Sequence, residues 1–314
     1  MRRLTFMSGM LVLIASSSAL AQGGSAVLSV DGRNVGTLHS ASGGAIGAEV
    51  INEATKGAPF SKKHLGAIQY DAFEIATSFG LDRSFYELIN KSFSGGAIRF
   101  DGVVSTIDLN GKIKQEREFR SAVITEVGFP GLDGASKEVG LMTIKMKPTT
   151  IRVTGGSGSS APSPGIKNKP WALSNFRFDM DGLDTRRVTK IEPFTVKRIM
   201  GAPTIVGPGG AIGPDKDSRI EYPNLKITLS EAFAKPWQQW LDDFVIAGNN
   251  SDGQEKSGSI VMMAADMRTE LGRINLSQCG IFRLSETKAA NGALVPGLLT
   301  AEIYCEQMIF DLAK

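Results

Sequence analysis

Histidine and cysteine are scarce in this 314-residue chain, which has two of each. The histidines, His39 and His64, form no tight His-x-x-x-His or Cys-x-x-Cys spacing with each other or with Cys279 and Cys305. Metal sites usually draw their ligands from such short spacings. The sequence also lacks a Gly-x-Ser-x-Gly elbow and a Gly-x-x-x-x-Gly-Lys-Ser/Thr loop. We therefore expect no metal, no organic cofactor and no catalytic residues, and the sequence favours a protein that is not an enzyme.

An excess of charge of one sign is also missing. The chain has 35 basic and 32 acidic residues, a formal charge of +3. Without Arg2 and Arg3, which lie in a segment that we expect to be removed, 33 basic and 32 acidic residues leave a charge of about +1. Proteins that bind nucleic acid or anionic membranes usually carry a clear basic excess. We expect neither kind of partner.

Long apolar runs are absent after the N-terminal segment, which has the pattern of a secretory signal peptide. Met1-Arg-Arg is a positive start, the apolar core around Met10–Ile14 is too short to span a bilayer, and Ala19-Leu20-Ala21 is a small-x-small cleavage site. Cleavage between Ala21 and Gln22 is predicted, with residues 1–21 as the signal peptide. The mature chain would then be exported to the periplasm, the cell surface or the extracellular space, with no membrane insertion.

The mature chain repeats one pattern twice, over about 25–153 and 175–312. Each copy opens with an apolar strand that ends in Asp-Gly, at Asp31-Gly32 and Asp181-Gly182. Each continues through a variable loop, a strand and a short amphipathic helix to a long strand after Gly-Lys-Ile or Gly-Arg-Ile. The Gly/Ser/Pro-rich residues 154–174 predict a linker. The expected domains are therefore 22–153 and 175–314.

Both copies are predicted to be mainly β with one short helix each. The helices are expected at Leu81–Phe93 and Pro236–Ala247, where apolar residues recur on one helical face. Trp237 and Trp240 on the second helix are interpreted as core residues, with a sugar-binding platform as the alternative. Alternating segments around the helices predict antiparallel strands. Because helices are so few, a small barrel or sandwich is the expected architecture of each copy.

The order of these elements resembles the tail-tube proteins of contractile phages and the related hemolysin-coregulated tube proteins of injection systems. The best local match is Tyr70–Phe93 with its mate Tyr222–Ala247, supported by the opening Val30–Gly36 and the terminal hairpins. The resemblance covers nearly all of both copies and is one of pattern, without an invariant signature. It implies two tandem antiparallel β-barrels of tail-tube type. It also implies assembly into stacked rings that form a hollow tube.

This chain departs from that family because it is doubled and carries a signal peptide. Six similar barrels close such a ring, so three chains with two barrels each could replace six chains with one barrel each. The predicted function is an exported structural protein whose partner is itself, in a trimeric ring or a stacked tube or filament. An exported two-domain β binding module for a glycan or a surface partner is the alternative. A second Gly/Pro-rich stretch, Gly201–Pro214, contains Ile205, Val206 and Ile212, which are candidates for an assembly contact.

The two cysteines are predicted to form a disulfide. A hairpin that turns at Asn291-Gly292 pairs residues whose numbers sum to about 583, and Cys279 and Cys305 sum to 584. Neighbours across antiparallel strands can meet the spacing that a disulfide requires. An oxidising compartment would preserve the bond. Two buried free thiols are the alternative.

Overall fold

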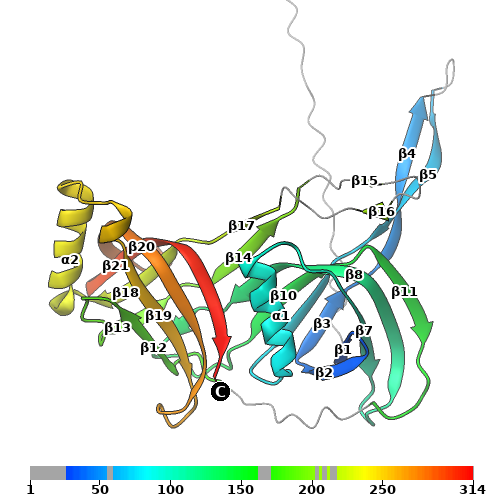
Figure 1. Ribbon diagram of the computed structural model, residues 1–314, viewed down its shortest axis with the longest axis horizontal. Helices are drawn as coiled ribbons and strands as arrows, with labels where there is room; N and C mark the ends of the chain where they lie inside the picture. Colours follow the sequence, from blue (N-terminus) through cyan, green and yellow to red (C-terminus); the bar gives the residue numbers. More distant parts are fainter. Residues whose placement is uncertain are drawn as a thin grey trace, which may run out of the picture.

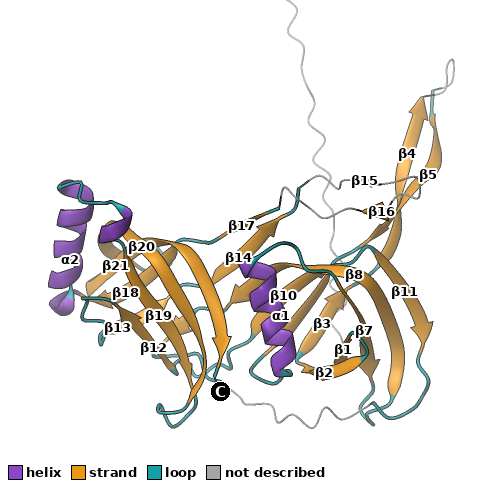
Figure 2. Ribbon diagram, in the orientation of Figure 1, coloured by secondary structure: helices purple, strands orange, loops and turns teal. Residues whose placement is uncertain are grey.

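The fold is mainly antiparallel β, as expected. The computed structural model describes residues 26–54, 59–161, 171–201, 205–206, 211–212 and 218–313. The predicted cleavage site, Ala21 and Gln22, and residues 162–170 of the predicted linker lie outside these residues. Two curved sheets lie side by side, α1 lies between them and α2 lies at one end of the molecule (Figures 1 and 2).

The first sheet contains most of the N-terminal half. Its strands run in the spatial order β2-β1-β7-β8-β10-β6-β3, and β11 and β14 also pair with β8. The elements of this half are β1 (Ala26–Val30), β2 (Arg33–Leu38), β3 (Ser40–Gly43), β4 (Ile46–Ala54), β5 (Ser61–Tyr70), β6 (Phe73–Thr77), α1 (Arg83–Ser94), β7 (Phe100–Ile107), β8 (Ile113–Phe129), β9 (Leu132–Asp133), β10 (Met142–Lys147) and β11 (Thr150–Gly155). Since β2 and β3 are consecutive in the chain, the two ends of this sheet approach each other and the sheet curls back on itself.

The second sheet is open. It runs β12-β19-β20-β21-β18-β13-β9. The C-terminal elements are β12 (Phe176–Met180), β13 (Val188–Ile191), β14 (Phe194–Ile199), β15 (Ile205–Val206), β16 (Ala211–Ile212), β17 (Arg219–Glu221), β18 (Leu225–Ser230), η1 (Glu231–Phe233), α2 (Lys235–Leu241), η2 (Asp242–Ile246), η3 (Asp252–Gln254), β19 (Lys256–Met263), β20 (Glu270–Lys288) and β21 (Leu294–Leu312). The outer edge of β13 pairs with β9 and not with β12, so among the described residues these strands form a half-barrel, and the expected pair of tandem barrels is not confirmed.

The two halves share one order of strands. In the first half it is β1-β7-β8-β10-β6-β3, and in the second it is β12-β19-β20-β21-β18-β13. In both, the strand before the helix and the strand after it occupy the same places in the sheet. The two sheets therefore place their strands in the same order relative to the helix.

Local irregularities also match between β8 and β20. Each strand has a non-glycine residue with positive φ, Ser121 at 47° and Gln278 at 52°, a conformation that few such residues adopt. Each has a second irregularity four residues later, where the register with the next strand shifts around Thr125 and Phe282. Arg283 therefore corresponds in position to Glu126.

The helices appear where the sequence places them, and both cover apolar cores. Asp82 caps α1, since its carboxylate accepts a 2.9 Å hydrogen bond from the backbone N–H of Ser84. Phe85, Tyr86, Ile89 and Phe93 form the buried face of α1. In the second helix Trp237 and Trp240 are buried, so their interpretation as core residues is confirmed.

Three further expectations need correction. The alternating segment before the first helix, Ala67–Phe79, is expected to form one strand, but it is divided between β5 and β6. The variable loop around residues 57–66 contains part of a long hairpin, in which β4 pairs with β5. The linker predicted over residues 154–174 is shorter, because β11 extends to Gly155 and Trp171 is fully buried.

Candidate assembly interface

The most distinctive site in the molecule is the joint where the two halves exchange strands. Strand β14 of the C-terminal half adds to β8 of the N-terminal half, with Phe194 opposite Phe129 and Lys197 opposite Glu126. In return β9 adds to β13, with Leu132 opposite Ile191. The sequence boundary at the linker is therefore not a boundary between sheets.

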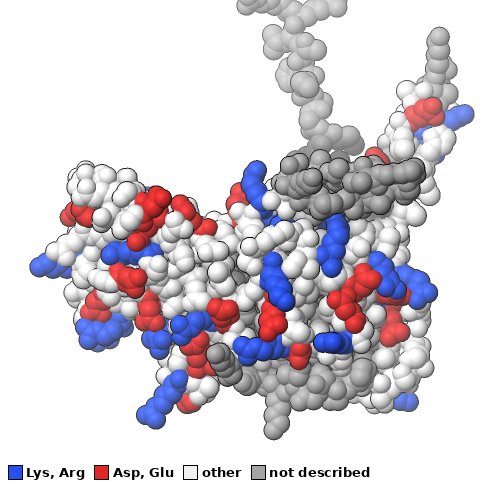
Figure 3. Space-filling model, in the orientation of Figure 1, with Lys and Arg blue, Asp and Glu red and all other residues white. Residues whose placement is uncertain are grey.

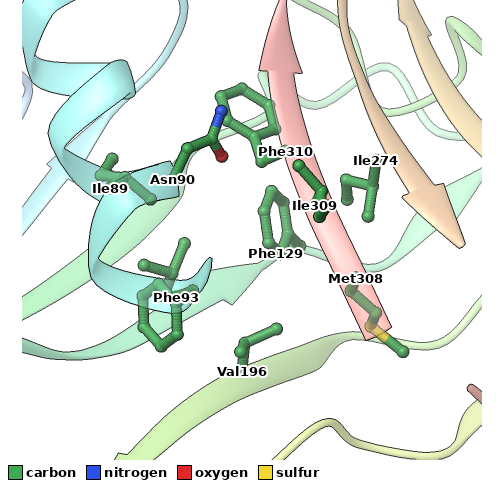
Figure 4. Close-up of a pocket in the computed structure, with 10 residues that line it drawn as sticks. Ile89, Asn90, Phe93, Phe129, Val196, Ile274, Met308, Ile309 and Phe310 are labelled. Atoms are coloured by element: carbon green, nitrogen blue, oxygen red, sulfur yellow. The ribbon is translucent and has the colours of Figure 1, made fainter. Parts of the chain in front are cut away.

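Apolar side chains from both halves pack beneath this joint. The rings of Phe129 and Phe194 stack with their centroids 5.1 Å apart, and Phe310 on β21 lies 5.8 Å from Phe129. Figure 4 shows Ile89 and Phe93 of α1 facing Val196 and the end of β21 across a small gap. The cavity there has a volume of about 20 Å³, room for about one water molecule. This seam is therefore a packed interface, too small to hold a ligand.

Polar groups of the C-terminal half close the C-terminal end of α1. Arg198 on β14 is buried, and its guanidinium donates to the backbone carbonyls of Ser92 and Gly95. The Tyr222 hydroxyl donates to the carbonyl of Phe93 over 3.1 Å. Carbonyls at a helix end have no partner within the helix, and a cation there is also favoured by the helix dipole. Burial raises the pKa of Tyr222, against the opposing effect of the Arg198 charge.

Residues of α1 also contact the C-terminal end of the same chain. Tyr86 packs with its ring centroid 5.7 Å from that of Phe310, and Asn90 donates to the Asp311 carboxylate over 3.3 Å. The Tyr86 hydroxyl donates to the Ser78 carbonyl over 2.8 Å, and burial raises the pKa of Tyr86 to about 12. A helix of the first half is thus sandwiched against β21 of the second, which ties the halves together at a third point.

Trp171 anchors the chain where it enters the second half. It is buried, lies edge-on to Phe79 at 5.6 Å, and donates from its indole N–H to the carbonyl of Asn175 over 3.1 Å. Gly140 is its close neighbour: a Cβ there would lie 2.1 Å from the indole ring. This contact fixes the point at which the segment from the undescribed residues rejoins the fold.

The two cysteines meet across the long C-terminal hairpin. Cys279 on β20 is directly opposite Cys305 on β21, and the structure contains the disulfide that the hairpin arithmetic predicts. The bond lies one residue beyond the irregularity at Gln278, where the pairing of β19 with β20 ends. It therefore fastens β20 to β21 at the point where β20 loses its other neighbour.

The other candidate residues are scattered. Ile205 pairs with Ile212 and Val206 with Ala211 in the short β15–β16 ladder, while most of the surrounding Gly/Pro-rich stretch lies outside the described residues. His64 is exposed on β5, where its ring lies 3.1 Å from the Glu53 carboxylate of β4. No three His, Cys, Asp or Glu residues gather as metal ligands within the described ranges.

The molecular surface carries mixed charge. On the face drawn in Figure 3, basic and acidic side chains alternate and no large area has a single sign. Several ion pairs have both side chains exposed, such as Arg177 with Asp179 at 2.8 Å, and such pairs contribute little to stability. Among the helices that the structure describes, none is long and apolar enough to cross a membrane.

Sequence comparisons give no assignment. No family model matches the chain, and no curated protein is similar to it at a significant level.

Several solved structures of contractile injection systems resemble part of the chain. The sheath–tube complex of the extracellular contractile injection system PVC matches at 17% identity and a TM-score of 0.37, over 47% of this chain and 99% of that one. The anti-feeding prophage baseplate matches at 11% identity and a TM-score of 0.38, over 45% and 97%. The tube-terminating cap of the anti-feeding prophage matches at 20% identity and a TM-score of 0.36, over 41% and 87%. These values are too low to assign a family.

Proposed function

We propose that this protein is an exported structural subunit, without catalytic activity, whose two halves are copies of one β unit and whose chains assemble with each other into rings or a tube. The observation that carries this proposal is the joint itself. One half extends the sheet of the other by adding β14 to β8, and the matching strand orders make both halves equivalent building units. Addition of a strand to a sheet edge is a common way to join separate chains.

If one chain added a strand to the sheet of the next in the same way, many chains would join into one assembly. Repeated contact between two different surfaces produces a closed ring if the rotation per unit closes, and a filament if it does not. The resemblance of the sequence pattern to tail-tube proteins favours a ring of six units, which three chains of two units would supply. Stacking of such rings would give a tube.

The assembly state of the mature chain tests this proposal. The chain from Gln22 onward, purified at several concentrations, should sediment as oligomers whose size rises with concentration, and negative-stain microscopy should show rings or filaments. A monodisperse monomer over the full range of concentration and salt would contradict self-assembly and favour the two-domain binding module. Export has a separate readout: the mature protein in its host should begin at Gln22, and a retained N-terminal segment would contradict it.

A further inference from the structure

We propose that the β4–β5 hairpin of one chain adds to the free edge of β20 in a second copy of this chain. This inference rests on the proposed self-assembly and specifies the two surfaces and the register that perform it. The internal joint serves as the template. There the β14–β17 hairpin is the donor, because it adds a strand, and the edge of β8 is the acceptor, because it receives that strand. Each half contains one donor hairpin and one acceptor edge, and the chain itself uses only one of each.

The donor is identified by its register. In the C-terminal half, β14 pairs with β17 so that Lys197 is opposite Glu221, and β14 is the strand that enters the foreign sheet. In the N-terminal half, β4 pairs with β5 so that Gly47 is opposite Gln69. The β4–β5 hairpin connects β3 to β6, and the β14–β17 hairpin connects β13 to β18, so each ends at the strand before the helix. A tyrosine, Tyr70 or Tyr222, lies three residues before that strand in each half. Strand β4 is therefore the counterpart of β14.

The environments of the two hairpins differ. Ile220 of β17 is half-buried against the core beside the joint, whereas its counterpart Ile68 of β5 is 63% exposed. Further apolar side chains on the β4–β5 hairpin are exposed: Ile46, Val50, Ile51 and Leu65. A two-stranded hairpin is only marginally stable in water by itself, and an exposed apolar patch of this kind marks an interaction site. Figure 1 shows the hairpin projecting from the first sheet, with its tip beyond the other described strands.

The acceptor is identified by the matched irregularities in β8 and β20. Pairing of β7 with β8 ends at Ala122, and the edge beyond it receives β14 at Glu126–Phe129. Pairing of β19 with β20 ends at the equivalent residue, Cys279. The counterpart of the receiving edge is Arg283–Glu286, and no strand within the described residues pairs with it on that side.

The surroundings of this edge fit an incoming hairpin. Phe282 is 40% exposed on β20. The last turn of the helix next to it exposes Val245 and Ile246, in the place where the end of α1 is covered in the internal joint. Tyr70 of the incoming hairpin would reach this helix end as Tyr222 reaches α1. One difference remains, because Ala48 stands at the position of Arg198, so the joint between chains lacks the buried guanidinium and would be the weaker of the two.

The donor hairpin β4–β5 and the acceptor strand β20 lie on opposite sides of the molecule (Figure 1). A pair of chains joined by one such contact therefore still has one unused hairpin and one unused β20 edge, to which further chains can bind. The template sets the register: Gly47 of one chain opposite Arg283 of the next, as Lys197 is opposite Glu126 within one chain.

Paired cysteines test this register. The double variant Gly47→Cys, Arg283→Cys should form disulfides between chains under mild oxidation and give a ladder of covalent oligomers. A Cβ at Gly47 meets no atom within 4 Å, so the substitution fits. The matched control is Lys197→Cys, Glu126→Cys, which should form its disulfide within one chain. The variant Gly47→Cys, Ser285→Cys, shifted by two residues along the edge, should crosslink more slowly by about tenfold, since the cysteines would be about 7 Å apart along the strand.

The outcomes separate this inference from the proposed function. A ladder with linked peptides containing positions 47 and 283 supports both. Oligomers that form without this crosslink, while the internal control crosslinks, overturn the hairpin contact and leave self-assembly standing. A chain that stays monomeric and gives no ladder overturns both.

A second pair of variants tests the contact without cysteines. Ile68→Asp places a charge on the face that would be buried, and should weaken association by at least about tenfold. Gln69→Asp is the matched control on the opposite face, where the counterpart Glu221 is already acidic and exposed, and should change association less than about twofold. Since Ile68 is largely exposed in the single chain, circular dichroism and the melting temperature should be unchanged. Equal association of both variants would overturn the proposal.

Discussion

At the scale of single residues, a few buried groups hold the two halves together. Arg198 provides the clearest case, since its charge lies in the interior and its donors are directed at the carbonyls of Ser92 and Gly95. A buried charge is tolerated only where hydrogen bonds and dipoles replace water. The end of α1 supplies both.

Replacement of Arg198 by methionine should therefore destabilise the protein. The side chain keeps a similar length but leaves the two carbonyls without this donor, at an expected cost of about 2–3 kcal/mol in the free energy of unfolding. Urea denaturation followed by tryptophan fluorescence measures the change. Arg268→Met is the control, because Arg268 is exposed and its loss should change stability by less than about 0.5 kcal/mol. Equal stability of the two variants would show that Arg198 does not support the joint.

The disulfide is a second residue-scale feature with a measurable effect. Cys279 and Cys305 are separated by 26 positions, and a loop of this size is expected to stabilise the fold by about 3 kcal/mol. The double variant Cys279→Ala, Cys305→Ala should unfold at lower urea by this amount, and reduction should bring the wild-type protein to nearly the same midpoint. In protein from the native host, mass spectrometry should find the linked Cys279–Cys305 peptide. Readily alkylated thiols at both positions would contradict the bond.

At the scale of elements, the N-cap of α1 links stability to pH. The pKa of Asp82 lies below its usual value of 3.8, first because of the hydrogen bond from the Ser84 hydroxyl and then because of the Ser84 backbone N–H. A lowered folded-state pKa gives stability that is complete above about pH 4 and is lost as the pH falls through the folded pKa.

Asp82→Ala should therefore lower the free energy of unfolding by about 1 kcal/mol at pH 7, the usual value of an N-cap. The difference from wild type should shrink below about pH 3.8. Denaturation curves at pH 7 and pH 3 measure it. Asp82→Asn keeps a cap oxygen that does not titrate, so its stability relative to Asp82→Ala should be the same at both pH values. A difference between wild type and Asp82→Ala that is constant with pH would contradict a charged cap.

The elements also show what a sequence can and cannot predict. Periodicity located α1 and α2, and the turn at Asn291-Gly292 placed Cys279 opposite Cys305, because these features depend on neighbours in the chain. The addition of β14 to β8 was missed. An alternating strand specifies which face is buried, but it carries no information on which distant edge it joins. The sequence predicts a variable loop in place of the β4–β5 hairpin, because the apolar residues of this hairpin cover no core of the chain itself.

A sequence signal for the joint did exist. Tyr70 and Tyr222 occupy matching places in the two halves, and Arg198 stands where the first half has Ala48. The shared tyrosine marks what both hairpins have in common, and Arg198 marks the hairpin that pairs within the chain. Arg198 can be matched with Ala48 only when the register of each hairpin is known.

At the scale of the whole molecule, the two halves are interlocked. Strand β14 lies in the first sheet, β9 lies in the second, and α1 packs between β8 and β21. Separation of the halves would expose the apolar seam around Phe129 and leave edges of both sheets unpaired. We therefore expect one cooperative unfolding transition and not two.

Cutting the chain between the halves tests this interlocking directly. A recognition site for a sequence-specific protease, inserted in the predicted linker between Ala161 and Trp171, allows the chain to be cut without interrupting a described helix or strand. The two fragments should then elute together from a sizing column, because strand exchange and the seam hold them without the covalent link. Denaturing gels should show two fragments, and the calorimetric and van't Hoff enthalpies of the uncut protein should agree. Fragments that separate without denaturant would mean that the halves are independent domains, and the internal joint could then no longer serve as the template for contacts between chains.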